Sequence, residues 1–148
     1  MRHLEYPGRS PVAAPNGMAS TSHPLSTQTA ITILRDGGNA LDAAIAACAV
    51  QCVVEPESTG IGGDCFCLYA PSGGDDIIAF NGSGRAPAGL SSDRLREQGI
   101  SRIERQSPHA VTIPGAVDAW TRLNRDHGRM DLDRLLACLL YTSDAADE

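Results

Sequence analysis

The segment ALDAAIAACAVQCVV, residues 40–54, constrains the fold more than any other part of this sequence. It contains six alanines between positions 40 and 49, so a helix formed here presents small side chains on all sides. Such a helix is typical of an element packed closely between others. Asn39 is placed to cap its N-terminus, where Asp42 favours the helix dipole, and Pro56 disfavours helix beyond about Val54. We therefore predict a central, enclosed helix.

The rest of the sequence predicts further helices and one β-hairpin. A helix opens at the stretch Ser22-His23-Pro24 and stops at Gly37. Two β-rich runs, residues 65–70 and 77–80, are joined by a turn-forming segment, which is typical of a hairpin. The other expected elements are a short strand at 18–20 and helices after Ser91 or Ser92, at 116–128, and from Asp131 or Asp133 through Leu136. This order predicts an α+β fold with helices packed on an antiparallel sheet.

Charge and composition argue against several classes of partner. Twelve basic and eighteen acidic residues give a net charge of −6 without a basic block, so we expect no nucleic-acid partner. We find no signal-peptide pattern and no apolar run that could span a bilayer, which predicts a cytoplasmic protein without a membrane partner. The five cysteines are expected to be reduced, and because their spacing matches no zinc motif we expect no metal.

A glycine-rich turn in TGIGGDCFCLYA, residues 59–70, directly precedes the first β-rich run. Glycines gather where the backbone takes positive φ or where a phosphate, a substrate or a packed neighbour approaches closely. A dinucleotide fingerprint has a different spacing and follows a strand, and the sequence has no Gly-Lys pair for a P-loop. We therefore expect no cofactor.

Several motifs, in a fixed order, resemble the N-terminal part of the large subunit of γ-glutamyltranspeptidase (glutathione hydrolase), over about residues 17–137. They include GMASTSHPLSTQTAITILRDGGNALDAAIAACAVQCVVEPESTGIGGDCFCLY, NGSGRAP, VTIPGAVDAW and HGRMDLDRLLA. The resemblance implies an N-terminal fragment of the αββα sandwich of N-terminal-nucleophile hydrolases. It also implies that the glycines at 60–63 shape the backbone between the central helix and a strand.

The resemblance implies that no catalytic residue lies in this sequence. Members of the family cleave their own precursor at a Thr-Thr dipeptide, and the exposed threonine uses its own α-amine as general base. This sequence has no Thr-Thr pair, and Thr21 matches the entry to the family's first helix. The expected partners are therefore the C-terminal part and the small subunit of the same precursor, together with a small amide substrate. The chain alone is expected to be inactive.

Ser83 and Arg85 are the candidate substrate-binding residues. Family members carry an arginine, two residues earlier in the same motif, that binds the α-carboxylate of the γ-glutamyl group. Ser83 takes that position here and the arginine stands at 85, so a loop-stabilising role for Arg85 is the alternative. The motifs NGSGRAP and GIGGD are most similar to those of the cytoplasmic γ-glutamyltranspeptidase-like branch.

The expected activity is hydrolysis or transfer of γ-glutamyl amides of the glutathione type. One alternative is a related amidohydrolase for another acyl group, such as oxamate or a cephalosporin side chain. The other alternative is a non-catalytic binding protein, or a pseudoenzyme, built on the same half-fold.

The C-terminal residues depart from the family pattern after Ala137. Family members continue into Pro-Ala and a further apolar helix, whereas this chain reads CLLYTSDAADE. Its acidic residues would crowd a helix C-terminus, where the helix dipole disfavours negative charge. We therefore expect residues 1–137 to be an incomplete N-terminal portion of a γ-glutamyltranspeptidase-like large subunit, and residues 138–148 to be a non-native tail.

Overall fold

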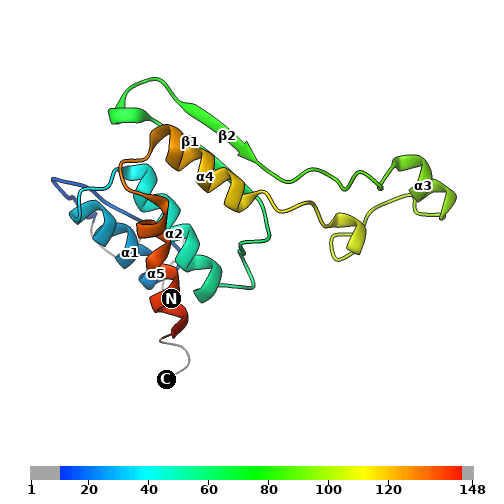
Figure 1. The fold of residues 1–148 in the computed structure, drawn as a ribbon, viewed down its shortest axis with the longest axis horizontal. Helices are drawn as coiled ribbons and strands as arrows, with labels where there is room; N and C mark the ends of the chain where they lie inside the picture. Colours follow the sequence, from blue (N-terminus) through cyan, green and yellow to red (C-terminus); the bar gives the residue numbers. More distant parts are fainter. Residues whose placement is uncertain (1–10, 145–148) are drawn as a thin grey trace, which may run out of the picture.

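A computed structural model describes residues 11–144 of the chain, which form helices around one β-hairpin (Figure 1). The elements are α1 (Pro24–Arg35), α2 (Ala40–Val54), β1 (Cys65–Tyr69), β2 (Ile78–Gly82), α3 (Ser92–Glu97), α4 (Ala116–His127) and α5 (Leu132–Asp144), with short 3-10 turns at Pro71–Gly73 and Pro108–Ala110. The predicted α+β class is confirmed. The predicted strand at residues 18–20 is wrong, because that segment is irregular.

Helix α2 is the centre of the core, as its alanine content predicts. Figure 1 shows α1 and α5 beside it, and α1, α4 and α5 all contact it. Ala46, Ala49 and Val50 are completely buried. Because alanine has no side chain beyond Cβ, the neighbouring helices can approach the α2 backbone closely and still exclude water.

Capping residues define where α1 and α2 begin. His23 Nδ1 accepts a hydrogen bond from the Leu25 backbone amide, and Asn39 Oδ1 accepts two from the first turn of α2. Asp42 Oδ2 accepts a hydrogen bond from the Asn39 backbone amide, which completes a capping box. On the inward face of α1, Ser26 and Ile33 are buried, whereas Leu25 is 45% exposed.

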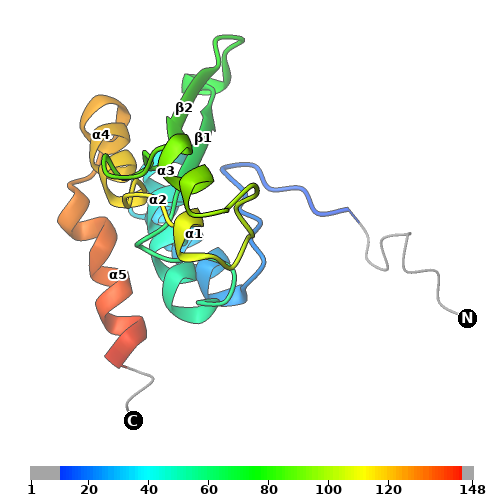
Figure 2. The same ribbon diagram turned by 90° about the vertical axis from the view of Figure 1, so that its right-hand side faces the viewer.

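The two strands form the predicted antiparallel hairpin, with Cys65 opposite Gly82 and Tyr69 opposite Ile78. Helix α4 contacts both strands, and Figure 2 shows the hairpin extending beyond the helices. Cys65, Cys67 and Tyr69 pack against the core cluster. Phe66 and Leu68 point to the opposite face and are 70% and 79% exposed, so the described part of the chain covers this sheet on one side only.

A fully buried carboxylate joins α2 to the turn between α4 and α5. Asp42 accepts hydrogen bonds from the Arg129 backbone amide at 3.1 and 3.2 Å and from the Asn39 amide at 2.9 Å. Asn124 Nδ2 donates to it at 3.5 Å and to the Met130 carbonyl at 2.8 Å. Asp42 therefore accepts from groups more than eighty residues away in sequence.

Helix α5 continues past residue 137, to Asp144. Leu139 is partly buried against the core cluster. The division of the chain at residue 137 and the non-native character of the tail stay predictions, and residues 145–148 of that tail lie outside the described residues. The N-terminal stretch used for the signal-peptide expectation, residues 1–10, lies outside them as well.

Candidate functional site

Three segments that are distant in sequence meet beside the N-terminus of α4. We call this meeting point the glycine crossing, formed by residues 63–64, 82–85 and 112–116. The Gly63 carbonyl accepts hydrogen bonds from the backbone amides of Gly115 and Ala116, at 3.0 and 2.9 Å. The Ile113 amide donates to the Arg85 carbonyl at 2.9 Å. The glycine turn at residues 60–63, which we call the first glycine turn, is thereby joined to the start of α4. The turn that contains Gly82 and Gly84, which we call the second glycine turn, is joined to the same unit.

Glycine is required in this crossing because backbones touch. A Cβ added at Gly84 would overlap the carbonyl oxygen of Ile113, and one added at Gly115 would collide with the carbonyl oxygen of Gly82. A side chain at Gly82 would collide with Ala119 of α4 and with the Cys65 carbonyl. The close neighbour at these three glycines is the chain itself.

The glycines of the first turn are less crowded than those of the second turn. The Gly63 amide donates to the Gly60 carbonyl at 3.0 Å, which closes a tight turn as expected. None of its glycines takes a positive φ, and a Cβ at Gly60 or Gly62 would meet nothing within 4 Å. Within the glycine crossing, the positions that have no room for a side chain are therefore Gly82 and Gly84 of the second turn and Gly115. The sequence motifs alone did not distinguish these glycines from those of the first turn.

Asp64 joins two of the crossing segments through its side chain. Its Oδ1 atom accepts a hydrogen bond from the Gly84 backbone amide at 2.9 Å and from Thr112 Oγ1 at 3.3 Å. Sequence reasoning missed this residue, although it stands at the join between glycine turn and strand.

Ser83 and Arg85 lie two residues apart on this crossing, and both are exposed. The Ser83 amide donates to Asn81 Oδ1 at 3.0 Å. Among residues 11–144, no ion pair involves Arg85. The Ile113 amide holds the Arg85 backbone, and no described carboxylate pairs with the Arg85 guanidinium. The assignment of both residues to substrate binding stays a prediction.

The cysteines of α2 and β1 have raised pKa values. Desolvation by neighbouring protein atoms raises the pKa of Cys48 to about 11, with smaller contributions from Cys65, Cys52 and Cys67, although Cys48 is exposed at the surface. Burial also raises the pKa of the other three thiols. These four side chains are therefore protonated near neutral pH and poor nucleophiles. No cluster of three or more His, Cys, Asp or Glu side chains in the described part of the chain could hold a metal ion.

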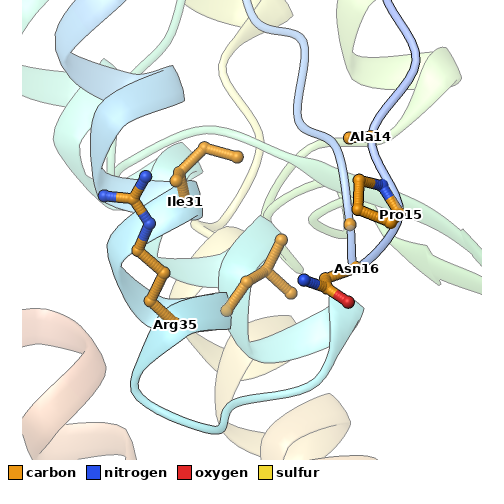
Figure 3. A pocket seen from close by; sticks show the side chains of 7 residues that line it. Ala14, Pro15, Asn16, Ile31 and Arg35 are labelled. Atoms are coloured by element: carbon orange, nitrogen blue, oxygen red, sulfur yellow. The ribbon is translucent and has the colours of Figure 1, made fainter.

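A separate hollow of about 540 Å³ lies between α1 and the segment that precedes it. Figure 3 shows Ile31 and Arg35 of α1 on one side and Pro15 and Asn16 on the other. Neither Ser83 nor Arg85 lines it. Across the described helices, none combines the length and the apolar character needed to cross a bilayer.

Comparison with known sequences finds relatives that match most of this chain. The chain is 36% identical over 119 residues to the glutathione hydrolase-like YwrD proenzyme of Bacillus subtilis, a match to 80% of this chain and 22% of that protein. It is 41% identical over 128 residues to the oxamate amidohydrolase proenzyme of Klebsiella pneumoniae, a match to 82% of this chain and 24% of that protein. The chain thus spans about a quarter of the length of these relatives.

Comparison with solved structures also finds a protein that matches most of this chain. Cephalosporin acylase from Bacillus halodurans superposes with a TM-score of 0.85 and 39% sequence identity, over 97% of this chain and 27% of that one. The sequence model described as gamma-glutamyltranspeptidase matches residues 26–141. The match covers most of the chain, including α2, the hairpin and the glycine crossing, and the chain therefore belongs to the gamma-glutamyltranspeptidase family.

Proposed function

We propose that this chain is part of an amidohydrolase that hydrolyses or transfers γ-glutamyl amides of the glutathione type. The remainder of the precursor would supply the threonine nucleophile and the oxyanion hole, and would be the main partner of the described fold. The family match and the likeness to a glutathione hydrolase-like proenzyme support this proposal. We also propose that the protein acts in the cytoplasm, which fractionation of the source cells would test.

The exposed guanidinium of Arg85 is the observation that carries the proposal. Substrates of this class bear a free carboxylate, and arginine pairs with carboxylates through charge-assisted, often bidentate, hydrogen bonds. Arg85 has no competing ion pair among the residues that the structure describes. The Ile113 amide holds its backbone through the Arg85 carbonyl at 2.9 Å. In this proposal Ser83, which is exposed on the same loop, would donate a second, neutral hydrogen bond.

Replacing Arg85 by alanine in the complete, processed enzyme tests this role. We expect kcat/KM for γ-glutamyl-p-nitroanilide to fall by an amount equivalent to roughly 1.5–3 kcal/mol, because a hydrogen bond to a charged group is lost. Arg105→Ala is the matched control, since Arg105 is also exposed and without an ion pair among the described residues. Equal kinetics for wild type and Arg85→Ala would reject Arg85 as the carboxylate anchor.

A second candidate substrate is oxamate, whose carboxylate adjoins the amide directly. The 41% identity to an oxamate amidohydrolase proenzyme favours it. Hydrolysis of oxamate and of γ-glutamyl-p-nitroanilide should be compared in the same enzyme preparation. A cephalosporin side chain belongs in the same panel because of the structural likeness to an acylase. Failure to turn over any of the three would favour the non-catalytic binding protein instead.

We expect the 148-residue chain alone to release no product from γ-glutamyl-p-nitroanilide or glutathione. It has no Thr-Thr pair at which the family's nucleophile could be generated. A sensitive assay of released p-nitroaniline is the measurement, with the complete enzyme as the positive control. Turnover by the purified chain that disappears on substitution of one of its own serines or threonines would contradict the prediction.

A further inference from the structure

Asp64 has contacts that differ from those of an ordinary exposed carboxylate. It forms no ion pair with any residue that the structure describes. Its Oδ1 atom instead accepts from the Gly84 amide, twenty residues away, and from Thr112 Oγ1, forty-eight residues away. A carboxylate is a strong acceptor for backbone amides, and this one joins the start of β1 to both other segments of the glycine crossing.

These contacts hold the backbone on both sides of the Arg85 side chain. On the N-terminal side the Gly84 amide is held by Asp64 at 2.9 Å, and on the C-terminal side the Arg85 carbonyl is held by the Ile113 amide at 2.9 Å. Thr112, which also donates to Asp64, immediately precedes Ile113. Asp64 therefore holds Gly84 by a direct hydrogen bond. It also holds Thr112, the residue next to Ile113, whose amide binds the Arg85 carbonyl.

Beyond Arg85 the chain leaves the core. Residues 86–111, which include α3, form an arm that projects away from the α2 helix in Figure 1. An arm of this kind gives little support to the residue at its base, so the position of Arg85 depends on the hydrogen bonds of the glycine crossing. Asp64 supplies the side-chain part of that support.

We propose that Asp64 is a positioning residue for substrate binding, acting by holding the Gly84–Arg85 backbone in the orientation from which the guanidinium reaches the substrate carboxylate. This inference rests on the proposed function of Arg85. Asp64 itself contacts neither substrate nor nucleophile in this proposal. The role requires an acceptor oxygen at Oδ1 and does not require negative charge, so asparagine should replace aspartate and alanine should not.

The test is a kinetic comparison of Asp64→Ala and Asp64→Asn in the complete, processed enzyme with γ-glutamyl-p-nitroanilide. We expect Asp64→Ala to raise KM about tenfold with little change in kcat, since ground-state and transition-state binding of the carboxylate weaken together. We expect Asp64→Asn to restore KM to within about threefold of wild type. In an Arg85→Ala background, Asp64→Ala should have almost no further effect, because the group that it positions is already gone.

Three results would overturn the inference: an unchanged KM in Asp64→Ala, no rescue by Asp64→Asn, or additive effects in the double variant. If Arg85→Ala alone leaves kinetics unchanged, the proposed function of Arg85 fails, and hydrogen exchange then decides the role of Asp64. Faster exchange of the Gly84 and Ile113 amides in Asp64→Ala, absent in Asp64→Asn, would support positioning of the loop. Equal exchange rates in all three proteins would overturn it.

Discussion

Gly84→Ala is expected to lower the free energy of unfolding by roughly 2–4 kcal/mol, because it forces two backbones apart and breaks their hydrogen bonds. The added Cβ would overlap the Ile113 carbonyl, an atom of the main chain that no rotamer change can move away. Separation of the two segments would break the bond from the Ile113 amide to the Arg85 carbonyl and the bond from the Gly84 amide to Asp64. Urea denaturation of the complete protein is the measurement.

The same loop provides the control for this substitution. A Cβ at Gly89 would meet nothing within 4 Å, and Gly89 has no positive φ. Gly89→Ala should therefore change the free energy of unfolding by less than about 0.5 kcal/mol, or stabilise slightly by restricting the unfolded chain. Similar denaturation midpoints for the two variants would mean that the crossing is looser than the backbone contacts indicate.

Asp42→Ala is expected to destabilise the protein by about 2–4 kcal/mol, because donors inside the structure lose their acceptor. The backbone amides of Asn39 and Arg129 both donate to this fully buried carboxylate, at distances of 2.9–3.2 Å. Asp42→Asn should be intermediate, because one oxygen remains while the new amide group faces a backbone donor. The free energy of unfolding from urea titration measures both effects.

Asp118→Ala is the control that separates the stability contributed by the buried hydrogen bonds of Asp42 from that contributed by the helix dipole. Asp118 and Asp42 both lie in the first turn of their helices, where a negative charge interacts favourably with the helix dipole. Asp118 is exposed and, among residues 11–144, forms an ion pair with Arg122 alone, at 3.6 Å, so its removal should cost less than about 1 kcal/mol. A loss for Asp42→Ala as small as that for Asp118→Ala would show that the buried contacts contribute little.

Local signals in the sequence were sufficient for the hairpin and for the starts of the helices, whereas α5 runs past its predicted end at Leu136 to Asp144. Asn39 caps α2 as predicted, Ser91 caps α3, and the two β-rich runs pair as a hairpin. These features depend on residues within a few positions of one another, so their physics is contained in a short stretch of sequence. The inward face of α1 was harder to predict, because Leu25 and Ser26 are neighbours and only the position of α2 decides which is buried.

What the sequence by itself determined is the class of fold, the family, and the central place of the alanine-rich helix. Only the tertiary structure decided that Gly84 and Gly115 are sterically constrained while Gly60 and Gly62 are not. It also decided that Asp42 accepts from the Arg129 amide and Asp64 from the Gly84 amide. The physical reason is that a backbone amide is the same donor at every position except proline, so sequence cannot indicate which distant amide reaches a carboxylate until packing brings the two together.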